Sequence, residues 1–264
     1  MVPATEHPVF APPPDPNVKI WRYMDFTKYV SMLDSGGLYF SRSDLLGDPF
    51  EGSSSQANIA LRSDVYKELI EEVTANSGED IAENMLQQMS KLREWNRQWL
   101  YVNSWHMNEH ESAAMWRLYA KTDEAIAVQS RYTYLRECLP LGVDLGGDNP
   151  AEVYVGEVRY INYETEWLPE GNLFFPIIHK RKSFEHEREL RAVIWDTTPG
   201  GDMSAINTTR GHLVRVPLAE MVEAVYVAPT SPAWFRDLVA AVTTKYGFAS
   251  TPIVSSSLGE DPVY

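Results

Sequence analysis

Hydrophobic and polar positions alternate along several short segments of the chain, as they do in half-buried β-strands. Val18–Tyr23 (VKIWRY) is the first of these segments. The alternation predicts strands at 18–23, 38–41, 101–105, 125–129, 153–163, 182–195, 212–216 and 222–227. Several strands joined by short connections favour an antiparallel sheet.

Apolar residues recur at helical spacing between these segments. Asn108 followed by Glu111 resembles a capping box, and Ser231–Pro232 is a typical helix start. The spacing predicts helices at 27–32, 63–100 with a break near 76–78, 109–121, 132–139 and 232–246. We therefore expect an α+β fold with a mostly antiparallel, split central sheet flanked by helices.

The chain reads as one domain after a short N-terminal segment. Proline is frequent up to about Pro16, which predicts a flexible arm over residues 1–17. No internal repeat or linker follows, so residues 18–264 are expected to form a single α+β domain. A chain of 264 residues is long enough for a sizeable core.

Composition limits the cellular compartments and the metal sites that are expected for this chain. Cys138 is the only cysteine, so no intrachain disulfide and no cysteine-pair zinc site can form. The chain has no apolar run long enough to span a bilayer, and its N-terminus lacks the pattern of a signal peptide. A reducing cytoplasm is therefore the expected location. The six histidines show no ligand spacing, so we predict no metal.

The formal net charge of −14 disfavours binding to nucleic-acid backbones and to anionic membranes. Lys180–Lys182 (KRK) is the one candidate for a local basic patch. The alternative is a solvated loop that precedes a strand. The sequence does not identify a small-molecule or protein acceptor or an oligomeric state.

The first candidate for chemistry is the polar turn SRSDLLGDPFEG at Ser41–Gly52. Asp48 and Glu51 supply carboxylates beside the turn formers Gly47 and Pro49. Asp48 could instead stabilise an Asx turn, and Glu51 could be an acid at a helix start.

The second candidate is FEHERELRAVIW at Phe184–Trp195. On a strand, Glu185, Glu187, Glu189 and Arg191 would share one face. Neighbouring carboxylates raise one another's pKa unless a cation is present. Arg191 can neutralise one of them. The alternative is an edge strand with a charged solvent face.

The third candidate is NSWHMNEHESAAMWRLYA at 103–120. Trp116 and Tyr119 share helical spacing with Met115, and Trp105 and His106 end a predicted strand. An aromatic stripe of this kind is common in cores, and a lone histidine is common as a structural residue. The chain has no nucleophile elbow and no GxGxxG fingerprint.

These segments together resemble the uncharacterised bacterial family catalogued as domain of unknown function 2971. The resemblance runs from about Ile20 to the final helix, and its most specific pieces are the DPFE turn, the MWxxYA helix and the ExExR strand. Members of that family often lie near mobile elements and phage-defence genes. The resemblance implies a role in phage defence or in a toxin system, and it implies no particular activity.

The order of polar residues is also similar to the ADP-ribosyltransferase superfamily. That resemblance implies that Arg22 and Ser41 hold the nicotinamide ribose and amide of NAD, and that Glu187 or Glu189 is the catalytic carboxylate. The usual Ser-Thr-Ser strand is replaced by Phe40-Ser41-Arg42-Ser43. The further candidate binding residues are Tyr23, Asp48, Glu51, Trp105, His106, Trp116, Tyr119 and Arg191.

Two alternatives remain beside an NAD-dependent transferase or glycohydrolase. In a non-catalytic sensor or interaction domain, the glutamates and Arg191 would form an ion-pair network with Arg22 or Arg42. In a metal-dependent phosphodiesterase, Asp48, Glu51, Glu187 and Glu189 would hold Mg²⁺. An open cleft that holds Arg22, Ser41 and Glu187 favours an enzyme, whereas a filled core favours the network.

Overall fold

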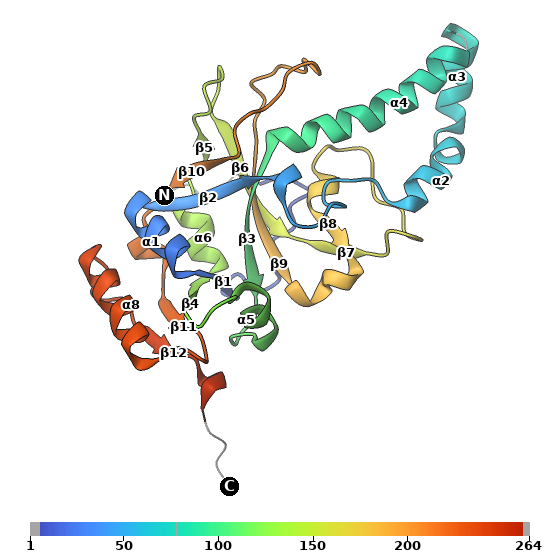
Figure 1. The fold of residues 1–264 in the computed structure, drawn as a ribbon. Helices are drawn as coiled ribbons and strands as arrows, with labels where there is room; N and C mark the ends of the chain where they lie inside the picture. Colours follow the sequence, from blue (N-terminus) through green and yellow to red (C-terminus); the bar gives the residue numbers. More distant parts are fainter. Residues whose placement is uncertain (1–5, 78, 261–264) are drawn as a thin grey trace.

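A ten-stranded sheet organises the computed structural model, which describes residues 6–77 and 79–260 (Figure 1). Eight strands follow the order β12-β11-β4-β1-β3-β9-β6-β5, and β2 and β10 branch from β3. All pairs in this sheet are antiparallel except β11 with β12. The strands are β1 (Lys19–Asp25), β2 (Gly37–Arg42), β3 (Leu100–Met107), β4 (Ala125–Arg131), β5 (Gly142–Val143), β6 (Ala151–Glu157), β9 (Glu189–Trp195), β10 (Gly211–Arg215), β11 (Ala224–Val227) and β12 (Ile253–Ser255).

The sheet forks at β3. One edge of β3 pairs with β9 along its whole length. On the other edge β2 pairs at Tyr101 and Val102, and β1 pairs at His106 and Met107. The residues between these two contacts, 103–105, have no partner strand on that edge within the described chain. The fork arises because α1 separates β1 from β2 in the sequence and carries β2 away from β1.

Helices surround the sheet, and three of them form an arm that projects from the body of the molecule (Figure 1). The helices are α1 (Phe26–Ser35), α2 (Gln56–Val65), α3 (Lys67–Ser77), α4 (Glu79–Asn96), α5 (Ala113–Tyr119), α6 (Tyr132–Cys138), α7 (Leu218–Met221) and α8 (Ala233–Lys245). The arm consists of α2, α3 and α4. The main core joins α1, α6 and α8 to the sheet, and the mixed α+β class with a mostly antiparallel sheet is confirmed. Among the described helices, none has both the length and the apolar character needed to cross a bilayer.

The capping box predicted at Asn108 and Glu111 does not form. Ser112 caps α5 instead, and its Oγ accepts from the Met115 amide at 3.4 Å. The Glu111 carboxylate accepts from the indole of Trp116 at 2.9 Å and from the amide of Ser257 at 2.8 Å. The Glu111 side chain, which the local pattern assigned to a helix cap, therefore forms tertiary contacts instead.

The N-terminal segment packs on the sheet. The side chain of Phe10 is buried, stacks on Tyr154 at a centroid distance of 5.2 Å and contacts Phe174 edge-on. A Cβ atom at Gly156 would lie 2.7 Å from the Phe10 Cα, so glycine is required for this close approach. For residues 6–17 the structure replaces the expected flexible arm with a packed segment, and residues 1–5 lie outside the described chain.

Candidate functional site

A cavity of about 870 Å³ opens at the fork of the sheet, between the diverging strands β1 and β2. Its size lies within the range of roughly 300–1,000 Å³ that small-molecule sites span. The candidate residues from the sequence line this one cavity, except Trp116. They are Arg22, Tyr23, Ser41, Asp48, Glu51, Trp105, His106, Tyr119, Glu187, Glu189 and Arg191.

Trp116 lies behind the cavity wall. Its ring packs edge-on against Tyr23 at 5.0 Å in a small core cluster, and only 4% of its surface is exposed. Trp116 is therefore not positioned to stack on a ligand in the cavity. Tyr119, one helical turn further along α5, lines the cavity and is 49% exposed.

The segment that carries the glutamates is not the continuous strand that the sequence predicted. Residues Lys182–Glu187 form a 3-10 helix, and β9 begins only at Glu189. Between them Arg188 adopts a left-handed conformation, with φ of 38°. Its carbonyl accepts from the Met107 amide at 2.9 Å, and its amide donates to Glu185 at 3.2 Å. This turn directs Glu187 to the cavity, whereas Glu185 lies exposed to solvent.

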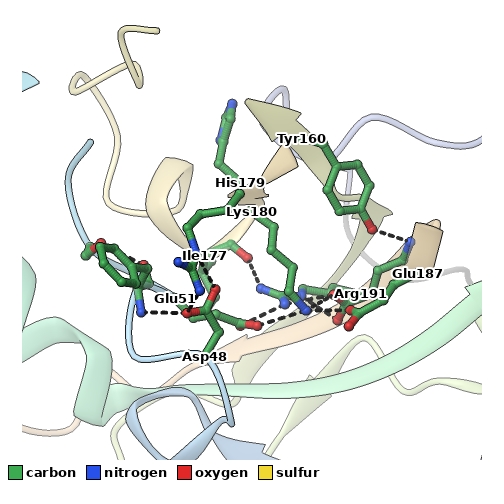
Figure 2. Close-up of polar contacts among 12 residues, drawn as sticks. Asp48, Glu51, Tyr160, Ile177, His179, Lys180, Glu187 and Arg191 are labelled. Atoms are coloured by element: carbon green, nitrogen blue, oxygen red, sulfur yellow. Dashed lines mark hydrogen bonds and ion pairs between the residues drawn. The ribbon is translucent and has the colours of Figure 1, made fainter. Parts of the chain in front are cut away.

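Four charged side chains form a closed, buried ring in the cavity wall (Figure 2). The Lys180 ammonium lies 3.1 Å from Glu51 and 3.3 Å from Glu189. Arg191 donates to Glu51 at 2.8 Å and to both oxygens of Glu189 at 2.7 and 2.9 Å. Its Nη1 also donates to the carbonyl of Ile177 at 2.6 Å. The two cations balance the two carboxylates, so the ring carries no net charge.

Ion pairing lowers the pKa of Glu189. Burial alone would raise this pKa, but Arg191 and then Lys180 overcome the effect of burial and bring it to about 2. The Arg191 guanidinium is almost fully buried at 1% exposure, and the same contacts raise its pKa. Glu189 and Arg191 are therefore ionised together at neutral pH.

Glu187 lies outside the ring as an additional carboxylate. The Lys180 ammonium donates to its Oε2 at 2.5 Å, and within the described chain this is its only ion pair. Burial raises the pKa of Glu187, the contact with Lys180 opposes that rise, and the charges of Glu189 and Glu51 add to it. Because the ring is neutral, an ionised Glu187 gives this side of the cavity one unbalanced negative charge.

Asp48 is held by a separate pair. Arg181 donates to its two oxygens at 2.8 and 3.2 Å, and the Arg181 guanidinium lies 4.2 Å from the ring centroid of Phe50. The Asp48 Oδ1 atom also accepts from the Phe50 amide at 3.0 Å, as an Asx turn requires. These contacts fix the turn that brings Glu51 to the ring.

The sequence predicted Arg191 as a partner of these carboxylates, but sequence reasoning missed Lys180 and Arg181. The expected partners Arg22 and Arg42 are not in the network, since Arg42 pairs with Asp44 at 2.7 Å. Lys180 and Arg181 take that place, so the alternative of a solvated loop at Lys180–Lys182 is wrong for Lys180, which is 7% exposed. A basic triplet shortly before a row of glutamates was the available signal.

Arg22 lines the cavity from β1. Its Nη1 donates to the Ser104 carbonyl at 3.0 Å, which satisfies a β3 acceptor left without a partner strand at the fork. Its guanidinium lies 5.9 Å from the centroid of Trp105, and burial lowers its pKa to about 10. No ion pair joins Arg22 to a carboxylate in the described parts of the chain, so its charge is free for an anionic ligand.

His106 connects the cavity floor to the glutamate turn. Its Nδ1 lies 2.6 Å from the backbone carbonyl of Glu187, and burial lowers its pKa. A neutral imidazole that donates from Nδ1 fits this contact. The Tyr119 phenol lies nearby, and burial together with the charges of Glu187 and Glu189 raises its pKa to about 12.

The carboxylates that could hold Mg²⁺ are each paired with a cation of the chain. Asp48 pairs with Arg181, Glu51 and Glu189 with Lys180 and Arg191, and Glu187 with Lys180. Across residues 6–77 and 79–260 no group of three or more His, Cys, Asp or Glu residues is placed so that it could hold a metal ion. A divalent cation would have to displace Lys180, so the arrangement does not favour the phosphodiesterase.

Comparison of the chain with protein-family models, with curated proteins and with solved structures finds no match. The resemblances to domain of unknown function 2971 and to the ADP-ribosyltransferase superfamily therefore stay predictions.

Proposed function

We propose that the chain binds NAD in the cavity at the fork of the sheet and cleaves its nicotinamide–ribose bond. One observation carries this proposal: Arg22, without a carboxylate partner in the described chain, and the additional carboxylate Glu187 line the same open cavity. NAD carries a cationic ring and an anionic diphosphate. A cavity with a free arginine on its β1 side and an excess carboxylate at the end of the 3-10 helix 182–187 complements both charges.

The reaction breaks the bond between C1′ of the ribose and the ring nitrogen of nicotinamide. The bonding electron pair leaves with nicotinamide, which becomes neutral. A water oxygen bonds to C1′ and its proton passes to solvent, which yields ADP-ribose and nicotinamide. With the nucleophile of a protein acceptor in place of water, the same step is an ADP-ribosyl transfer.

Glu187 is the carboxylate assigned to the reacting carbon. Positive charge develops on the ribose as the bond breaks, and a nearby carboxylate stabilises that charge. Glu187 has a single ion pair, whereas Glu189 is held in the ring by both Arg191 and Lys180. Glu187 therefore has free hydrogen-bonding capacity for a ligand, and Glu189 serves to fix the wall behind it.

The remaining lining residues suit a ligand with planar rings. Tyr119 and Tyr39 line the cavity and are about half exposed, at 49% and 48%. Aromatic faces of this kind stack on nicotinamide or adenine. Ser41 of β2 supplies a hydroxyl at the opposite branch of the fork from Arg22.

Nicotinamide release from NAD, measured by chromatography with and without cell lysate, tests the proposal. The wild-type chain should release nicotinamide, and Glu187→Gln should reduce the rate at least about 100-fold because the developing charge loses its counter-charge. Glu185→Gln is the matched control, since Glu185 is exposed two residues away. No release by the wild-type chain under either condition would remove the proposal.

The closed ring of Lys180, Glu51, Arg191 and Glu189 supports a second candidate, a non-catalytic sensor that binds the same ligand without cleaving it. Buried ion-pair networks occur without catalysis. Calorimetry separates the two candidates: a sensor would bind NAD and leave it intact over hours, whereas an enzyme would consume it.

A further inference from the structure

Lys180 occupies the one position from which a single ammonium reaches all three glutamates. Its Nζ lies 2.5 Å from Glu187, 3.1 Å from Glu51 and 3.3 Å from Glu189 (Figure 2). Of the three N–H donors of an ammonium, two bond to Glu187 and Glu189, and Glu51 lies within ion-pair distance. Its side chain is 8% exposed and lies 4.9 Å from the ring centroid of Phe184, which limits access of water to it.

The two cations of the site differ in what they contact. Arg191 pairs with Glu51 and Glu189, and in the described part of the chain it forms no ion pair with Glu187. Lys180 contacts the same two carboxylates and Glu187 as well. Loss of Lys180 would leave Glu51 and Glu189 with a partner, but Glu187 would keep no cation among the residues described.

We propose that Lys180 is the positioning residue that keeps Glu187 charged and directed into the cavity at neutral pH. The catalytic role of Glu187 in this inference rests on the proposed function. The contact between Lys180 and Glu187 is independent of that function. Lys180 does not touch the reacting bond in this assignment. It acts through Glu187, so it controls the pH range of activity.

The other groups around Glu187 do not replace this cation. Glu51 and Glu189 are negative and disfavour its charge. His106 contacts only its backbone carbonyl, and burial keeps that imidazole neutral at pH 7. The charge of Glu187 also acts on the phenols of Tyr119 on α5 and Tyr160 on β7 (Arg159–Ile161).

The test compares the pH profile of nicotinamide release for the wild type, Lys180→Met and the exposed-neighbour control Lys182→Met. Glu187 must be ionised to act, so activity falls as the pH drops through its pKa. Removing an adjacent cation raises a carboxyl pKa by about one to three units. The acid limb of Lys180→Met should therefore move up by about one pH unit or more, and that of Lys182→Met should not move.

An unchanged acid limb in Lys180→Met, with only a lower rate at every pH, would overturn the inference and leave Lys180 as a packing residue. If Lys180→Met does not fold, the double variant Lys180→Met/Glu51→Gln removes one charge of each sign and keeps the net charge of the cluster. An upward shift of the acid limb, smaller than in the single variant, is expected there, because the Glu51 charge that also raises the pKa of Glu187 is removed with Lys180.

A second measurement separates this inference from the proposed function. A carbon-13 NMR titration of glutamate-labelled protein, with Glu187→Gln to assign the resonance, follows the Glu187 carboxyl without any assay of activity. If the wild type releases no nicotinamide, the proposed function fails. The inference about Lys180 then stands only if Lys180→Met raises the titration midpoint of Glu187 by about one unit or more.

Discussion

The Arg191 guanidinium donates two hydrogen bonds to the Glu189 carboxylate, from Nε to Oε1 at 2.7 Å and from Nη2 to Oε2 at 2.9 Å. Their positions on β9, two residues apart, place both side chains on one face of the strand. Both side chains are more than nine-tenths buried. Such a pair contributes mainly through the cost of breaking it, because one charge would remain buried alone.

The first prediction concerns how much Glu189 and Glu187 each contribute to the stability of the fold. Glu189→Gln leaves Arg191 without half of its counter-charge and should lower the free energy of unfolding by about 3–5 kcal/mol. Glu187→Gln removes a carboxylate whose only cation, Lys180, keeps its contacts with Glu51 and Glu189, and it should lower that free energy by less than Glu189→Gln does. Urea unfolding at pH 7 measures both values. A similar loss in both variants would contradict the separation of the ring from Glu187.

Acid should weaken the fold through Glu189. The pKa of Glu189 is depressed to about 2 in the folded state from an ordinary value of 4.5. Its contribution to stability is therefore present above pH 4.5 and is lost as the pH falls toward 2. Thermal melts from pH 6 to pH 2 should show a falling melting temperature, with a shallower slope in Glu189→Gln. If the melting temperature falls equally steeply with pH in both proteins, groups other than Glu189 cause the loss of stability in acid.

Glycine should be tolerated at position 188 better than a branched residue. Arg188 has a φ of 38°, which costs an L-residue about 1 kcal/mol, and its Nη1 donates to the exposed side chain of Asn108 at 3.3 Å. Arg188→Gly should leave the free energy of unfolding unchanged or raise it by up to about 1 kcal/mol. Arg188→Val should lower it, since a β-branched side chain fits this conformation poorly. Urea unfolding of the two variants compares them directly.

The N-terminal segment should contribute measurably to stability. Phe10 is 5% exposed and packs between Tyr154 and Phe174. Phe10→Ala should lower the free energy of unfolding by about 3 kcal/mol through lost burial and a residual cavity. Glu6→Ala, which removes one exposed ion pair with Arg136, is the control. Equal effects of Phe10→Ala and Glu6→Ala would contradict the packed segment.

Arg22 should govern ligand affinity more than stability. Its guanidinium has one hydrogen bond, to Ser104, and no carboxylate partner in the described chain. Arg22→Gln keeps a donor for that carbonyl and removes the charge. The affinity for NAD, measured by calorimetry, should fall at least about tenfold, which corresponds to about 1.4 kcal/mol. The melting temperature without ligand should stay close to that of the wild type.

Much of the local structure was readable from the sequence because it depends on short-range pattern. The alternation in VKIWRY predicted β1, and the turn-forming residues Asn76-Ser77-Gly78 predicted the break between α3 and α4. Local pattern failed where a side chain had a distant partner. Glu111 binds the segment at 256–257 across the fold instead of capping its own helix. Val153–Tyr163 divides into β6 and the separate β7 because β7 pairs with β8 (His179–Arg181).

The residue types near positions 22, 41, 48–51 and 187–191 were identifiable from the sequence alone, because charged and polar residues beside apolar strands are conspicuous. Only the tertiary structure decided their partners. It placed Lys180, rather than Arg22 or Arg42, between the glutamates, and it left Arg22 at the fork. The reason is that an ion pair depends on a few ångströms between strands that lie far apart in the sequence, and no local periodicity contains that distance.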